Sequence, residues 1–295
     1  MALSPQLILP LFVQAEPPKK EPILTASLTV LLLYTAFIGW TLLASWFCLR
    51  FLDRLNLTSL GLTFYRGWWR ELSFGLVMGP LMMAMVVGLQ FIGGGTRVTP
   101  NPVWWQSGTV NYAGLPLVAS GTSSALLLLI LAGAFEELNY RGYPFQTLLR
   151  DLPALIPVLL FALLFGIAHW GNPNRTFFST ANTVLAGIWL SMAYLKTRGL
   201  WLPTSLHFTW NWTMGGFFGL PVSGLLISRH PIFLATSETP VWLTGGSYGC
   251  EGGAAATIVL IAATIFIWRT KWLKVSPAMQ AVWDRDSEQP SSALS

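Results

Sequence analysis

The sequence contains few charged residues and few cysteines for its length. Only 10% of its 295 residues are Asp, Glu, Lys or Arg, whereas soluble domains carry about 25%. Two cysteines, Cys48 and Cys250, are too few for a disulfide framework or a cysteine-rich metal site. The net charge of +5 is scattered along the chain, which argues against a nucleic-acid-binding surface. The composition therefore excludes an ordinary soluble domain and a disulfide scaffold.

Apolar residues take the place of the missing charge. The chain is 53% hydrophobic, has a mean hydropathy of +0.56 and contains 15 Trp residues, a residue type that collects at membrane–water interfaces. A helix needs about 20 apolar residues to cross the hydrocarbon core. The sequence therefore predicts an all-α, polytopic transmembrane helix bundle with about seven spans. These lie near 24–48, 72–93, 115–138, 154–171, 176–196, 200–221 and 253–269.

The ends of the chain predict its domain organisation and orientation. We expect an N-terminal extramembrane segment over 1–22, a transmembrane domain over 23–270 and a flexible cytoplasmic tail over 271–295. The apolar run Leu7–Val13 has no positive charge before it, so a cleaved signal peptide is not expected. Of the 17 Lys and Arg residues, 12 fall in the tail and in the connections after the first, third and fifth segments. The positive-inside rule then places the C-terminus in the cytoplasm.

Four ionisable residues lie inside apolar segments, where they are costly. Glu136 and Glu137 directly follow an apolar run, and His169 and His207 are two of only three histidines in the chain. A carboxylate at the centre of a bilayer costs at least about 2.5 kcal/mol. Taken singly, the glutamates could end a helix and each histidine could be an ordinary core residue. Taken together, they are the candidate functional set.

Helical spacing groups these residues with two more. Glu137 and Arg141 are four residues apart, so they share a helix face and can form an ion pair. Glu136 lies about 100° further round the helix and can face another partner. His207 and Asn211 are also four residues apart, so both side chains can converge on one point.

Glu136 and His169 can also lie at the same depth in the membrane. We expect the helix that carries Glu136 to continue through Arg150 and to turn at Leu152-Pro153. Glu136 and His169 lie at nearly equal distances along the chain from Pro153. In an antiparallel hairpin they would therefore lie at the same level, since both helices rise by the same length per residue.

Three motifs in this region resemble those of a known family. Glu136-Glu137-Leu-Asn-Tyr-Arg141, Phe165-Gly-Ile-Ala-His169 and His207-Phe-Thr-Trp-Asn211 are similar to the EExxxR, FxxxH and HxxxN motifs of the CPBP intramembrane proteases. This family includes the type II CAAX prenyl endopeptidases and bacteriocin-processing proteins. The resemblance covers about 115–221, in the family's order. The glycine-rich stretch around Glu251 resembles a segment of bacterial members.

The resemblance implies an intramembrane glutamic-type endopeptidase within 23–270, with its motif core at 115–221. Glu136 and His169 would hold and activate a water, and Glu137 and Arg141 would position Glu136. His207 and Asn211 would stabilise the oxyanion. The implied partners are membrane lipids and a peptide or protein substrate, lipidated or not, in a bacterial plasma membrane; no cofactor and no nucleic acid are implied.

Three alternatives remain open on the sequence alone. Two histidines and a glutamate can ligate zinc, although no HExxH motif is present and Asn211 is a poor zinc ligand. A scaffold or immunity protein could keep the fold without proteolysis. A proton-coupled transporter could use the same intramembrane Glu and His residues, although no inverted repeat is visible in the sequence.

Overall fold

The computed structural model describes residues 27–287, and most of its regular structure is helical. The predicted extramembrane segment 1–22 lies outside the described residues, as do 288–295 of the predicted tail. The α-helices are α2 (Leu28–Phe47), α3 (Trp68–Ile92), α4 (Leu115–Tyr140), α5 (Tyr143–Asp151), α6 (Leu155–Ala168), α7 (Phe177–Thr197), α8 (Trp201–Trp212), α9 (Val241–Thr244), α10 (Ala254–Arg269) and α11 (Pro277–Ser287).

Short turns of other helix types and four short strands complete the regular structure. The π-helical segments η1 (Cys48–Leu52) and η3 (Thr213–Phe217) extend α2 and α8, and the 3₁₀ turns are η2 (Leu57–Leu60), η4 (Gly246–Tyr248) and η5 (Cys250–Gly252). The strands are β1 (Thr96–Pro100), β2 (Trp105–Gln106), β3 (Thr109–Val110) and β4 (Phe233–Ser237).

A helix occupies each of the seven segments predicted to span the membrane. By length and composition, three helical stretches within 27–287 qualify as spans. They are Leu28–Leu52, which combines α2 and η1, Trp68–Ile92, which is α3, and Leu115–Asp151, which combines α4 and α5. The apolar helices α6 and α10 are shorter. The mainly helical fold is therefore confirmed, whereas the number of seven spans stays a prediction.

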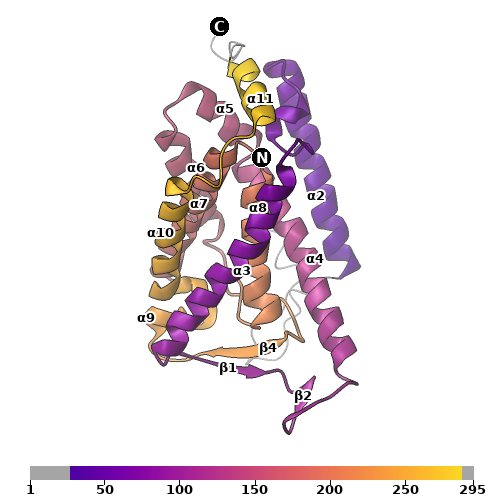
Figure 1. Cartoon of the computed structure of the whole chain (residues 1–295), viewed down its shortest axis with the longest axis vertical. Helices are drawn as coiled ribbons and strands as arrows, with labels where there is room; N and C mark the ends of the chain where they lie inside the picture. Colours follow the sequence, from indigo (N-terminus) through magenta and orange to yellow (C-terminus); the bar gives the residue numbers. More distant parts are fainter. Residues whose placement is uncertain (1–26, 288–295) are drawn as a thin grey trace.

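Helix α8 is the centre of the bundle. It packs against α3, α4 and α7, and eight of its 12 residues are buried, as expected for a helix without a solvent or lipid face. Figure 1 shows α3 running beside α8 and α2 at the edge of the bundle beside α4. The residues placed on α8 are consequently held from several sides.

The prediction of one continuous helix from Glu136 to Arg150 is wrong, because the helix is interrupted at Arg141 and Gly142. Helix α4 ends at Tyr140, and α5 begins at Tyr143 with Pro144 in its first turn. A proline cannot donate the backbone hydrogen bond that a continuous helix needs. A Cβ on Gly142 would stand 2.0 Å from the Leu138 carbonyl oxygen, so the tight turn requires glycine.

The end of the bundle away from α5 is closed by a two-stranded sheet. Strands β1 and β4 pair antiparallel with Thr96 opposite Ser237 (Figure 1). Next to this sheet, the side chain of Gln90 hydrogen-bonds the carbonyl oxygens of Leu243, Thr244 and Cys250 at 3.3–3.4 Å. A buried amide that reaches three carbonyls fixes the loop between α9 and α10.

Part of the predicted tail, 277–287, forms the helix α11, and the flexibility of the tail stays a prediction. Met279, Trp283 and Asp286 recur at helical spacing. Met279 and Asp286 are buried, and the Arg198 guanidinium lies 3.9 Å from the centroid of the Trp283 ring. The polar composition of the tail hid this pattern, since α11 buries one narrow face and leaves the rest polar.

Some glycines on α3 lie so close to α8 that a larger side chain would not fit. A Cβ on Gly79 would stand 2.0 Å from Thr209 Oγ1 and 3.0 Å from the Trp210 backbone nitrogen on α8. We expect Gly79→Ala to destabilise the protein by about 1–3 kcal/mol, the usual cost of overpacking. Thermal unfolding in detergent measures the effect.

The matched control is Gly88→Ala on the same helix, where a Cβ would meet nothing within 4 Å. This substitution should leave the melting temperature unchanged or raise it slightly, because Ala favours the helix over Gly. Equal melting temperatures for the two variants would contradict the close packing of α3 on α8.

Candidate active site

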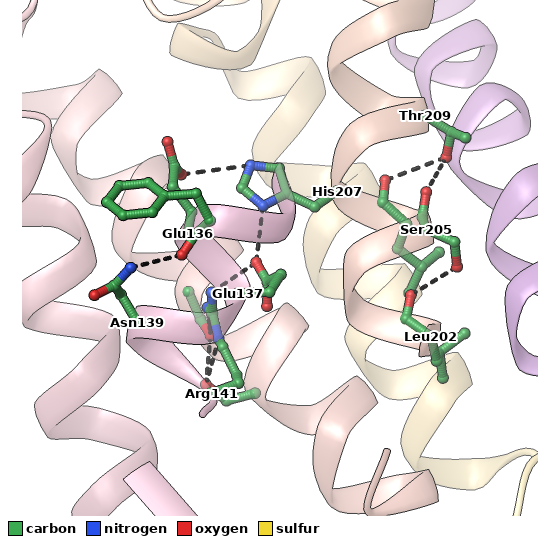
Figure 2. A network of polar contacts seen from close by, with 12 residues as sticks. Glu136, Glu137, Asn139, Arg141, Leu202, Ser205, His207 and Thr209 are labelled. Atoms are coloured by element: carbon green, nitrogen blue, oxygen red, sulfur yellow. Dashed lines mark hydrogen bonds and ion pairs between the residues drawn. The ribbon is translucent and has the colours of Figure 1, made fainter. Parts of the chain in front are cut away.

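Three helix segments bring the six predicted site residues together. The last turn of α4 carries Glu136 and Glu137, and Arg141 caps its C-terminus. His169 caps the C-terminus of α6, and α8 supplies His207 and Asn211. Figure 2 shows Glu136 and Glu137 pointing to opposite ring nitrogens of His207.

Glu137 and Arg141 form a fully buried ion pair. Arg141 Nη1 lies 2.9 Å from Glu137 Oε1, and both side chains are 0% exposed. The guanidinium also donates to the Gly187 carbonyl oxygen at 2.8 Å and lies 5.0 Å from the centroid of the Phe165 ring. Buried charges persist when they are paired and hydrogen-bonded in this way, and the i, i+4 pairing expected from the sequence is present.

His207 connects this ion pair to Glu136. Its Nδ1 lies 2.8 Å from Glu137 Oε1. A carboxylate paired with arginine only accepts hydrogen bonds, so Nδ1 carries the proton and donates it. The other ring nitrogen, Nε2, lies 3.7 Å from Glu136 Oε2. The ion pair therefore sets the orientation of the imidazole against Glu136.

His169 approaches the same oxygen of Glu136 from α6. Its Nδ1 donates to the Phe165 carbonyl oxygen at 2.7 Å, which fixes the ring, and its Nε2 lies 4.0 Å from Glu136 Oε2. Distances of 3.7 and 4.0 Å are too long for direct hydrogen bonds. They are the distances at which one small polar group bridges two side chains.

Glu136 Oε2 is the atom on which the site converges. It is buried and has no hydrogen-bond partner among residues 27–287, although the Glu136 side chain is 16% exposed. Unpartnered buried polar atoms are rare and call for an explanation. Two imidazole nitrogens and one carboxylate oxygen thus surround a point that suits a water or a polar substrate atom.

These groups line one pocket. Glu136, His169, His207 and Asn211 all face it, whereas Glu137 and Arg141 lie behind them. The cavity volume is about 120 Å³, and a single water needs only about 10–15 Å³ by this measure. The pocket therefore has room for a water and for part of a substrate.

Three residues that were not predicted as site residues also line the pocket, namely Tyr34, Ser223 and Glu251. Glu251 had a signal in the sequence, since it is an acidic residue in a glycine-rich stretch shortly before the apolar helix α10. Tyr34 and Ser223 had no comparable signal, because neither a single Tyr in an apolar helix nor a single Ser in a loop indicates a site by itself.

No metal ion was predicted for this site, and the arrangement of the potential metal ligands bears on that prediction. Within 27–287, no three His, Cys, Asp or Glu side chains are arranged so that they could hold a metal ion. His207 also directs Nδ1 to Glu137, which leaves Nε2 as its free nitrogen. Chelation of the purified protein tests metal dependence directly.

A comparison with known families supports the resemblance seen in the motifs. Residues 119–213 match the family model of the Rce1-like type II CAAX prenyl endopeptidases. The predicted resemblance is thereby confirmed for this segment, which runs from α4 to the start of η3 and contains all six predicted site residues. This family is one of proteases that act on prenylated CAAX proteins. Searches among curated proteins and among solved structures give no match.

The buried ion pair predicts a large effect of Arg141 on stability. We expect Arg141→Ala to cost about 3–5 kcal/mol, because it leaves Glu137 buried without the arginine that balances its charge, with only the bond from His207 remaining. Arg97→Ala is the control. Arg97 pairs with Glu238 at 3.3 Å, and its side chain is 79% exposed. Ion pairs at exposed positions contribute only about 0–1 kcal/mol to stability. Similar melting temperatures for the two variants would contradict the role of the buried pair.

Proposed function

We propose that this chain is an intramembrane endopeptidase that hydrolyses a peptide bond with a water activated by Glu136 and His169. The observation that carries the proposal is the convergence of His169 Nε2 and His207 Nε2 on Glu136 Oε2, at 4.0 and 3.7 Å. The family match over 119–213 supports protease chemistry for the same residues. Apolar helices of spanning length support a site within the membrane.

In the proposed reaction, Glu136 is the general base. It takes one proton from the water as the water oxygen bonds to the carbonyl carbon, and the carbonyl π electrons move to the oxygen. Collapse of the tetrahedral intermediate restores the C=O bond and breaks the C–N bond, and the leaving nitrogen takes up the proton that Glu136 removed from the water, which regenerates the carboxylate. A general base must be within reach of the water, and the position of Glu136 Oε2 near two imidazole nitrogens supports this role.

Asn211 and His207 are proposed to stabilise the oxyanion. Both lie on α8 and line the pocket beside Glu136. An amide NH₂ is a suitable hydrogen-bond donor to a developing negative charge. His207 donates Nδ1–H to Glu137, so its Nε2 can donate to the oxyanion only when the ring is an imidazolium, and that is the form proposed for this step. His207 is held in place before the substrate binds by its bond to Glu137, which is a condition for effective electrostatic stabilisation, and Asn211 lies one helical turn further along α8.

The proposed substrate is a peptide or protein at the membrane surface. The matched family acts on prenylated CAAX proteins, so a farnesylated peptide with a C-terminal CAAX sequence is the first substrate to test. The same peptide without the farnesyl group tests whether the lipid is needed. Cleavage of either peptide supports endopeptidase activity, and the ratio of the two rates reports lipid preference.

The general-base assignment predicts the behaviour of Glu136→Gln. The variant keeps the size of the side chain but removes the base, so it should fold normally and lose cleavage, by about 10²-fold or more. The assay uses purified protein in liposomes and the farnesylated fluorogenic peptide. Glu238→Gln, at an exposed position, is the matched control and should cleave at the wild-type rate.

The same assay tests the zinc alternative. Wild-type protein should keep its activity after exhaustive chelation, since Glu136 and the histidines suffice for the proposed step. Activity that is lost to a chelator and restored by zinc would replace the water-activating glutamate with a metal-dependent mechanism. A Glu136→Gln variant that cleaves near the wild-type rate would overturn the general-base assignment itself.

The oxyanion assignment predicts a specific kinetic signature for Asn211→Ala. Its effect belongs to the transition state, so kcat should fall by roughly 10²-fold while KM changes little. Asn139→Ala is the control, because the Asn139 side chain donates to the Phe135 carbonyl oxygen of its own helix and does not line the pocket. A raised KM with unchanged kcat for Asn211→Ala would instead assign Asn211 to substrate binding.

A further inference from the structure

Trp189 on α7 carries a hydrogen-bond donor that no described residue satisfies. The residue is 1% exposed, and its Nε1 has no hydrogen-bond partner within 27–287. An indole N–H can only donate, and buried tryptophans usually find an acceptor for it. Because a buried donor without an acceptor destabilises the folded state, its retention at this position suggests that a ligand supplies the acceptor.

The Trp189 side chain lines the pocket that contains the proposed catalytic groups. It borders the same cavity as Glu136, His207 and Asn211. Seven buried side-chain N and O atoms within 27–287 lack a partner, and two of them belong to residues that line this cavity, Glu136 Oε2 and Trp189 Nε1. A carboxylate oxygen accepts hydrogen bonds and an indole N–H donates one. The pocket therefore has unused hydrogen-bonding capacity of both kinds.

The backbone that carries Trp189 is tied to the buried ion pair. Arg141 Nη2 donates to the Gly187 carbonyl oxygen at 2.8 Å. Ser191 Oγ donates to the same oxygen at 2.8 Å. Gly187 and Ser191 lie two residues before and two residues after Trp189 on α7. These bonds fix this part of α7 relative to α4, which carries Glu136.

The Trp189 ring is also in contact with a neighbouring ring on α8. The ring centroids of Trp189 and Trp210 are 5.8 Å apart, and the ring planes are inclined by 54°. Trp210 directly precedes Asn211, which is proposed to bind the oxyanion. The face of an aromatic ring is only a weak acceptor for an N–H group. The contact therefore places the Trp189 indole beside α8 without replacing a full hydrogen bond.

A peptide substrate brings suitable acceptors into the pocket, namely its main-chain carbonyl oxygens. Moving a carbonyl group from water into a largely apolar cavity is unfavourable unless the oxygen accepts a hydrogen bond there. The hydrocarbon chain of a lipid has no such acceptor. The Trp189 N–H and a peptide carbonyl therefore each provide the partner that the other needs.

We propose that the indole N–H of Trp189 donates a hydrogen bond to a main-chain carbonyl oxygen of the bound substrate and so sets the position of the peptide relative to Glu136. This inference rests on the proposed function. The bond is made in the enzyme–substrate complex and is kept in the transition state, so its loss weakens binding and leaves the chemical step unchanged. Trp189 is thus assigned to substrate binding, whereas Asn211 is assigned to the transition state.

The first test removes the donor and keeps the shape of the side chain. Replacement of Trp189 by 3-benzothienylalanine, introduced by nonsense suppression, puts sulfur in the place of the N–H group. With whichever of the two peptides the wild type cleaves, KM should rise by roughly tenfold with little change in kcat, because a buried carbonyl loses its donor. Trp242→Phe, at a position that is 64% exposed, is the control and should cleave as the wild type does. A fall in kcat at unchanged KM would overturn the assignment to binding.

The second test observes the N–H group itself and needs no cleavage. The Glu136→Gln variant, labelled with ¹⁵N-tryptophan in detergent micelles, is titrated with the farnesylated peptide and with the peptide that lacks the farnesyl group. The Trp189→Phe and Trp242→Phe spectra assign two of the 15 indole signals. Binding should move the Trp189 indole proton downfield, as a new hydrogen bond does, while the Trp242 signal stays in place. A Trp189 signal that does not move at saturating peptide overturns the inference, whatever the activity.

The third test compares the stability of the free proteins. A donor without an acceptor adds nothing to the folded state, so the 3-benzothienylalanine protein should melt at the wild-type temperature or slightly above it. A clearly lower melting temperature would mean that the N–H group is already bonded in the free protein, and this would overturn the inference. Absence of cleavage by the wild type on both peptides contradicts the proposed function, whereas the melting comparison still decides whether the Trp189 donor is unpaired.

Discussion

The site depends on the ion pair between Glu137 and Arg141. Two charges in an apolar bundle are tolerable when they are paired and hydrogen-bonded. Arg141 is held by Gly187 on α7 and the ring of Phe165 on α6, and Glu137 Oε1 is shared by Arg141 and by His207 on α8. One buried pair on α4 thus fixes three neighbouring helices relative to Glu136.

Adjacent glutamates have opposite environments because a helix turns by about 100° per residue. Glu137 is 0% exposed, and its Oε1 pairs with both Arg141 and His207, whereas Glu136 is 16% exposed and lines the pocket. Glu137 therefore holds neighbouring side chains in place. Glu136 can be reached by a ligand, which is why the two residues have different proposed roles despite their identical chemistry.

Local spacing predicted the contacts that lie within one helix, and the structure bears this out. The Glu137–Arg141 pair follows from four-residue spacing, and the apolar segments predicted all seven long helices. The break at Gly142 was missed because it depends on the tight turn at Gly142 and on Pro144 two residues later, not on hydropathy. Helix α11 was missed because its buried face is narrow, and Glu251 because its partner Ser223 is 28 residues away.

The lining of the pocket comes from different parts of the chain. Glu136, His169, His207 and Asn211 lie within the matched segment 119–213, whereas Tyr34, Ser223 and Glu251 lie outside it. The family match therefore concerns the groups proposed to act on the scissile bond. It supports protease chemistry at these four residues, and it does not extend to the part of the pocket that Tyr34, Ser223 and Glu251 form.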